Sequence, residues 1–209
     1  MPSGAQVALA ALGPVVHAAL WAVVRWRRVP LVAASGITMA VLGASAAVIG
    51  PVAASRRFDP IVAVGIGLAT GVALYGATVA FMSVARRVPA VTGHTEALYG
   101  EGANRSMAVV LVVSILVSVP GEELLWRGVV LGVLGRLLGS AGLAAVLCWA
   151  AFAAINAISG RIPIILGAVV GGAVWTSVAW WTGGIVAPIV SHAAWTALMI
   201  VFPPPGARS

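Results

Sequence analysis

Two adjacent glutamates stand inside an apolar stretch of the chain, and an arginine follows four residues after the second. These are Glu122, Glu123 and Arg127, and the two glutamates are the only ones of the chain's five acidic residues inside an apolar run. An ionisable side chain in a membrane helix costs about 2.5–3.5 kcal/mol on insertion scales, so it is a candidate for function. The chemistry open to paired carboxylates is general acid–base catalysis.

Helical geometry separates the two carboxylates. Glu123 and Arg127 are four residues apart, so on a helix they are neighbours on one face and are well placed to pair. Glu122 lies about 100° away around the helix, where Arg127 is poorly placed to neutralise it. The unpaired Glu122 is therefore a candidate general base toward water. The alternative is that both acids and Arg127 form a packing network between helices.

Two later apolar stretches carry further polar residues at one-turn spacing. Asn156 follows Phe152 by four residues, and Thr196 follows His192 by four. An asparagine in a membrane helix often only hydrogen-bonds a neighbouring helix, and a single histidine can serve packing, proton transfer or ligation. Together with the glutamates, however, these residues indicate one wet pocket where three segments converge. His17 and His94 have no polar partner near them in sequence and are interpreted as incidental.

The composition indicates which elements must position these residues. Of 209 residues, 61% are hydrophobic and 8% charged, and the mean hydropathy is +1.09. A soluble domain carries about 25% charged residues, so a water-soluble enzyme and a disordered tether are excluded. Seven membrane helices of about 20 residues each would use roughly 140 residues. We expect one all-α, polytopic transmembrane bundle of about seven spans, between six and eight.

Seven apolar stretches can be separated by charges, glycines and prolines. They are 5–24, 31–54, 60–85, 106–138, 141–159, 162–181 and 184–202. The fourth would be about 50 Å long as one helix, and Pro120–Gly121 at its middle predicts either a kinked helix or two segments. The polar stretch 86–105 is expected to be an exposed loop, and 203–209 a disordered tail. Residues 1–105 thus form N-terminal helices with a polar loop, followed by a core at 106–202.

The basic residues argue for a lipid bilayer rather than a nucleic acid as partner. All 12 are arginines, giving a net charge of +7, and most stand where apolar runs end. The clusters are Arg25, Arg27 and Arg28, then Arg56–Arg57 and Arg86–Arg87. Such flanking charges orient a membrane protein, whereas a nucleic-acid surface would combine basic and aromatic residues on one polar face. The lone Cys148 can form no disulfide within the chain.

Taken together, these residues resemble the signatures of the CPBP intramembrane proteases, the CAAX-processing and bacteriocin-immunity family also called ABI. Glu122-Glu123-x-x-x-Arg127 resembles the EExxxR signature of that family, Phe152 to Asn156 stands where it has FxxxH, and His192 to Thr196 where it has HxxxN. The resemblance covers about 106–202. It implies that Glu122 activates a water for attack on a peptide bond, that Glu123 and Arg127 support it, and that the other two signatures bind the water and the oxyanion.

Two departures from the family pattern bear on this reading. Asn156 replaces the family's histidine and cannot take up a proton, although its amide can still donate a hydrogen bond. Thr196 replaces the family's asparagine and donates over a shorter reach. A dyad of Glu122 and His192 remains. These two would be the plausible ligands of a zinc ion, fewer than the three usual at a catalytic zinc, so no cofactor is predicted to be required.

Three functions remain open from the sequence. The favoured one is a CAAX-type intramembrane endopeptidase of a bacterial plasma membrane, acting on a peptide or protein substrate through Glu122 and His192. The alternative is a catalytically degenerate family member that acts as a scaffold, immunity factor or partner of another membrane protein. A small transporter is the third, but no internal repeat supports it.

Overall fold

Helices and short connections make up this protein. The structure, a computed structural model, describes residues 1–27, 29–50, 57–103 and 105–207, and no strand occurs among them. The elements, with π-helical segments written η, are α1 (Gly4–Arg27), α2 (Leu31–Ile49), α3 (Pro60–Ala85), α4 (Pro89–Ala103), α5 (Met107–Val113), η1 (Ser114–Ser118), α6 (Val119–Glu123), η2 (Leu124–Val130), α7 (Leu131–Leu138), α8 (Ala141–Ala157), α9 (Ile162–Leu166), η3 (Gly167–Gly171), α10 (Gly172–Thr182) and α11 (Val186–Val201). The all-α class predicted from the sequence is confirmed.

Five helical stretches of the described chain are long and apolar enough to cross a bilayer. They are Gly4–Arg27, Leu31–Ile49, Pro60–Ala85, Met107–Leu138 and Ile162–Thr182. Two shorter apolar helices, Ala141–Ala157 and Val186–Val201, bring the total to the seven stretches predicted from the sequence. The chain is therefore an integral membrane helix bundle. Arg28, Arg56 and the end of the predicted second stretch at 51–54 lie outside the described residues.

The fourth stretch is one continuous helix, which decides between the two alternatives left open by Pro120–Gly121. It runs from Met107 to Leu138 and contains two π-helical segments, η1 and η2. Proline has no N–H to donate to the preceding turn and strains a regular α-helix. Here the turn before Pro120 is already wide, because the Val119 N–H donates to the Ser114 carbonyl five residues back. π-Helical turns of this kind are often found at functional sites.

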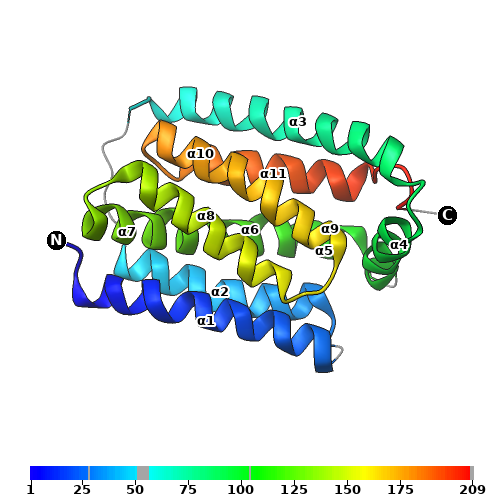
Figure 1. Cartoon of the computed structure of the whole chain (residues 1–209), viewed down its shortest axis with the longest axis horizontal. Helices are drawn as coiled ribbons and strands as arrows, with labels where there is room; N and C mark the ends of the chain where they lie inside the picture. The colour runs from blue at the N-terminus through cyan, green and yellow to red at the C-terminus, as the bar shows by residue number, and fades with distance from the viewer. Residues whose placement is uncertain (28, 51–56, 104, 208–209) are drawn as a thin grey trace.

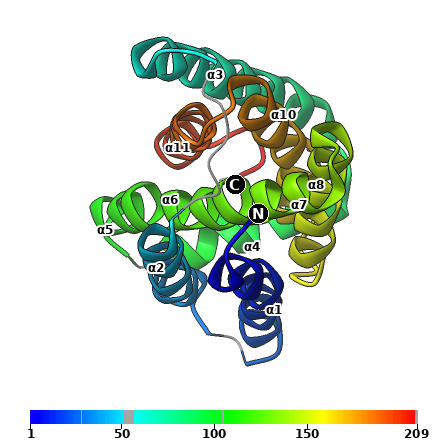
Figure 2. The same cartoon turned by 90° about the vertical axis from the view of Figure 1, so that its left-hand side faces the viewer.

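This long helix crosses the bundle obliquely, between two groups of helices. Figure 1 shows the bundle from the side, and in Figure 2 the green α5–α7 helix has α1 and α2 on one side and α3, α10 and α11 on the other. The short α6 contacts α2 and α11, and η2 contacts α1. Side chains on opposite faces of one helix therefore meet elements from opposite ends of the chain.

Glycines allow the close approach of backbones around α6. A Cβ on Gly43 of α2 would lie 2.6 Å from the Cα of Gly121, and one on Gly121 would meet the Met39 carbonyl. On the far side, a Cβ on Gly71 of α3 would lie 2.6 Å from the Ser191 carbonyl of α11. Small residues commonly bring membrane helices together in this way. These contacts fix the positions of the helices that carry the glutamates and His192.

The expectation of a loop at 86–105 is wrong, because most of that stretch is the helix α4, Pro89–Ala103. Tertiary contacts stabilise this helix. It packs against α9, and Arg161 Nη1 donates a hydrogen bond to Glu101 Oε2 at 3.0 Å. The Ile162 N–H also donates to His94 Nδ1, at 3.2 Å. A short polar helix stabilised by tertiary contacts shows no apolar periodicity by which the sequence could reveal it.

The C-terminal residues, expected to be a disordered tail, are described as far as residue 207. Residues 203–207 are not helical, and Pro204 and Ala207 among them are buried. A Cβ on Gly206 would lie 3.3 Å from the Cβ of Arg86, so this turn packs against the start of the α3–α4 connection. Residues 208–209 lie outside the described residues.

Candidate active site

Glu123 is the centre of a fully buried polar network. Its Oε1 accepts a hydrogen bond from Arg127 Nη1 at 3.1 Å and lies 2.8 Å from His192 Nδ1. The side chains of both Glu123 and Arg127 have no exposed surface. The pairing of Glu123 with Arg127 is the contact that their four-residue spacing predicted. Because a carboxylate only accepts, His192 carries its proton on Nδ1.

Arg127 also connects the long helix to α10. Its Nε and Nη2 each donate to Thr176 Oγ1 at 3.2 Å, and Nη2 donates to the Gly172 carbonyl at 3.2 Å. The guanidinium also lies over the Phe152 ring, 4.5 Å from its centroid, which is a favourable cation–π contact. Arg127 therefore acts as a brace that fixes Glu123 relative to α8 and α10.

Aromatic side chains hold His192 in place. Its ring stacks on Trp175 with 3.6 Å between centroids and 16° between planes. Two buried polar atoms nearby, Glu123 Oε2 and Trp175 Nε1, have no hydrogen-bond partner in the part of the chain that the structure describes. Buried polar groups are nearly always hydrogen-bonded, so such atoms are where a polar molecule would bind most favourably.

Glu122 lies in a different environment from its neighbour. Its side chain is 16% exposed, and its Oε1 is 3.7 Å from Nε2 of His17 on α1. Part of the Glu122 side chain is thus accessible from outside the bundle, whereas the Glu123 side chain is fully enclosed. The sequence interpretation of His17 as incidental is wrong: the residue is 1% exposed and lies against a predicted site residue.

The remaining predicted site residues lie on α8 and α11. Asn156 is buried, and its Nδ2 donates to the Phe152 carbonyl of its own helix at 2.9 Å. Thr196 is partly buried, one turn beyond His192. The sequence predicted a dyad of Glu122 and His192; the hydrogen bond of His192 is instead made to Glu123. The reason is geometric, since the face of the long helix that meets α11 is the one carrying Glu123.

The donor set does not fit a catalytic zinc ion. Among the described residues, no group of three histidine, cysteine, aspartate or glutamate side chains is gathered that could hold a metal. Glu123 Oε1 is already engaged by Arg127 and His192. One carboxylate and one imidazole remain at Glu122 and His17, fewer than the three protein ligands usual at a catalytic zinc.

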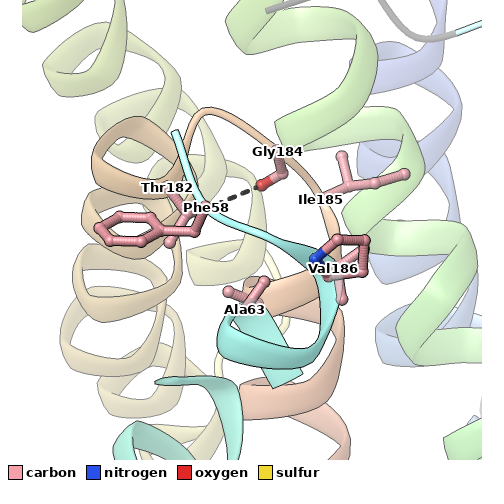
Figure 3. Close-up of a pocket in the computed structure, with 8 residues that line it drawn as sticks. Phe58, Ala63, Thr182, Gly184, Ile185 and Val186 are labelled. Atoms are coloured by element: carbon pink, nitrogen blue, oxygen red, sulfur yellow. Dashed lines mark hydrogen bonds between the residues drawn. The ribbon is translucent and has the colours of Figure 1, made fainter. Parts of the chain in front are cut away.

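A small pocket opens near the end of α10, apart from these residues. Its lining is Phe58, Pro60, Ala63, Thr182, Gly184, Ile185, Val186 and Ala187. Figure 3 shows the Thr182 hydroxyl directed at the Gly184 carbonyl, at 3.5 Å, in the turn that leads into α11. Gly183, with φ of 69°, ends α10 at this turn. None of the predicted site residues lines this pocket, but the turn sets where α11, and so His192, begins.

Comparison with known protein families matches one segment of this chain. A family model described as Rce1-like, type II CAAX prenyl endopeptidase Rce1-like, matches residues 104–198. No curated protein and no solved structure matches the chain. The matched segment contains Glu122, Glu123, Arg127, Asn156, His192 and Thr196. Residues 104–198 are therefore similar to this family of CAAX endopeptidases, which confirms the resemblance that the signatures indicate.

Proposed function

We propose that the protein is an intramembrane endopeptidase in which Glu122 activates the attacking water. The observation that carries this proposal is the contrast between two adjacent carboxylates within a segment of the CAAX endopeptidase family. Glu123 is enclosed and bound to Arg127 and His192, whereas the Glu122 side chain is partly exposed and its ion-pair contact is with His17. A general base must reach water and substrate, and of the two side chains only that of Glu122 is partly exposed.

The proposed reaction is a general-base hydrolysis. Glu122 takes a proton from water as the water oxygen attacks the scissile carbonyl carbon, which forms a tetrahedral oxyanion. Glu122 then delivers that proton to the amide nitrogen as the C–N bond breaks, so that an acid and an amine leave. His192, with Nδ1–H held by Glu123, has an unprotonated Nε2, which can accept a hydrogen bond from the attacking water and orient it. The substrate class is a peptide segment delivered within the membrane.

Protein termini in membranes test this proposal directly. Cells carrying wild type, Glu122→Gln or the control Glu96→Gln on α4 are compared at equal levels of the protein. Specific N- and C-termini are expected to be present with wild type and with Glu96→Gln and to be absent with Glu122→Gln, which keeps the side chain's size but removes the base. Identical terminal profiles for all three would overturn the proposal.

One observation favours a second function, that of a catalytically degenerate family member with a scaffolding role. The Asn156 amide is bound to its own helix, and Glu123, Arg127 and Thr176 are tied together as a structural network would be. In that case the phenotype of a deletion strain is restored equally by wild type and by Glu122→Gln. The same variant therefore separates the two functions.

A further inference from the structure

His17 of α1 is surrounded by aromatic rings and lies next to Glu122. The ring centroids of Trp21 and Trp126 are each 6.1 Å from that of His17, and the Phe152 centroid is 6.3 Å away. His17 belongs to α1 and so lies outside the segment 104–198 that matches the endopeptidase family. Neither the family match nor the signatures assign it a role.

The hydrogen bonds around His17 determine where its proton lies. Trp126 Nε1 is 3.1 Å from His17 Nδ1, and Trp21 Nε1 is 3.1 Å from His17 Nε2. An indole N–H only donates, and a neutral imidazole has one accepting nitrogen and one N–H. The ring can therefore accept from only one of the two tryptophans, and its other nitrogen must donate.

Burial decides between the two choices. Trp126 has no exposed surface, and if Nδ1 carried the proton, two N–H groups would face each other in the core with no acceptor between them. Leaving a buried donor unsatisfied costs about 1–3 kcal/mol. With Nδ1 accepting from Trp126, the Nε2–H is free to donate, and Glu122 Oε1, 3.7 Å away, is the acceptor beside it. The Trp21 N–H, 3.1 Å from Nε2, is then the donor that loses its acceptor on the ring, and Trp21 is 7% exposed whereas Trp126 is fully enclosed.

We infer that His17 is the positioning residue of Glu122: Trp126 fixes its tautomer, and its Nε2–H holds the Glu122 carboxylate or the water bound to it. This deepens the proposed function and rests on it. The reactive carboxylate is thereby oriented by the N-terminal helix, while its neighbour Glu123 is oriented by α10 and α11. A separation of 3.7 Å is bridged by a small shift of the carboxylate or by one shared water.

The tautomer is tested without any substrate. Nuclear magnetic resonance of protein with ¹⁵N-labelled histidine resolves the ring nitrogens, and the signals lost in His17→Gln assign those of His17 among the chain's three histidines. The expected result is a bare Nδ1 and a protonated Nε2, with the Nε2 signal moved by Glu122→Gln. A protonated Nδ1, or an Nε2 signal that Glu122→Gln leaves in place, would overturn the inference.

Three variants at position 17 test the effect on cleavage, read as the termini that depend on Glu122. A glutamine amide reaches the position of Nε2 and preserves the donor, whereas an asparagine amide reaches only the position of Nδ1. We expect His17→Gln to keep most of the cleavage, and His17→Asn and His17→Phe to lose about 10- to 100-fold, as small misplacement of a catalytic group does. Protein levels and thermal unfolding in detergent are measured for each variant.

The outcomes separate this inference from the proposed function. If Glu122→Gln abolishes the termini and His17→Phe does not, the proposed function stands and the inference falls. Equal losses for His17→Gln and His17→Asn, parallel to losses of stability, would mean a merely structural histidine and also overturn it. If no terminus depends on Glu122, both the proposed function and the inference fail.

Discussion

The two adjacent glutamates form two carboxylate–imidazole pairs that differ in almost every physical respect. Glu123 and His192 are 2.8 Å apart, fully braced by Arg127 and closed to the outside. Glu122 and His17 are 3.7 Å apart, and the Glu122 side chain is 16% exposed. One step along a helix turns a side chain by about 100°, so one pair faces α11 and the other faces α1. We propose from this contrast that the closed pair, Glu123 and His192, maintains structure and that the open pair, Glu122 and His17, is the one available for chemistry.

The largest expected effect is on activity, at the open pair. Glu122→Gln is expected to lower cleavage about 10²- to 10⁴-fold, the range that general acid–base catalysis contributes, while thermal unfolding in detergent stays near that of the wild type. The cause is that the amide cannot take a proton, while the one ion-pair contact of Glu122 among the described residues is the 3.7 Å approach to the neutral His17. A stability loss as large as the activity loss would make the open pair structural.

The closed pair is expected to give the opposite result. Glu123→Gln leaves Arg127 buried without its counter-charge, and removing one partner of a buried ion pair costs about 3–5 kcal/mol. The free energy of unfolding in detergent measures this, with Arg87→Ala at the exposed α3–α4 turn as the control. An unchanged free energy of unfolding would mean that the Glu123–Arg127 ion pair does not stabilise the fold.

A smaller effect is expected at Thr176 of α10, whose hydroxyl accepts hydrogen bonds from Arg127. Thr176→Val removes the hydroxyl that accepts from Arg127 Nε and Nη2, while Glu123 and the Gly172 carbonyl remain as partners. A hydrogen bond to a charged group contributes about 1.5–3 kcal/mol, and this is the expected loss of unfolding free energy. Ser83→Ala, on α3, is the control, because that exposed hydroxyl bonds to the Val79 carbonyl of its own helix, and cleavage by both variants is expected to persist.

The smallest effect concerns the approach of α2 to the helix that carries both pairs. Gly43→Ala places a methyl 2.6 Å from the Gly121 Cα, so the two helices must separate, at a cost of about 1–3 kcal/mol typical of overpacking. Gly76→Ala, on α3, is the matched control because a Cβ there meets nothing within 4 Å. Equal unfolding temperatures for the two variants would contradict this close contact.

Spacing and hydropathy along the sequence were enough to predict one contact of the site and the helices that carry it. The four-residue separation of Glu123 and Arg127 predicted their ion pair, and the hydropathy of the seven stretches predicted the helices. The continuity through Pro120 was not predictable, because it depends on a π-helical turn whose wide hydrogen bonding leaves no mark in composition. The helix α4 was missed for a related reason, since contacts with α9 and Arg161 stabilise it rather than its own apolar pattern.

One contact of His17 could be predicted from the sequence and another could not. The bond to Trp126 joins residues 109 positions apart, which no local pattern reveals. Trp21, however, follows His17 by four residues, so the two lie on one helical face, and that spacing was a signal for a buried histidine with a polar partner. The role of Asn156 was likewise not predictable, because an amide can bond its own helix or a neighbour.

The hydrogen bond between Trp126 and His17 also has a consequence for how the two residues vary among related chains. Trp126 lies inside the segment shared with the endopeptidase family, and His17 lies outside it. If the indole fixes the imidazole, either residue alone is of little use, so related chains should gain or lose the tryptophan and the histidine together. The N-terminal helix and the signature-bearing helix would then have evolved as one unit.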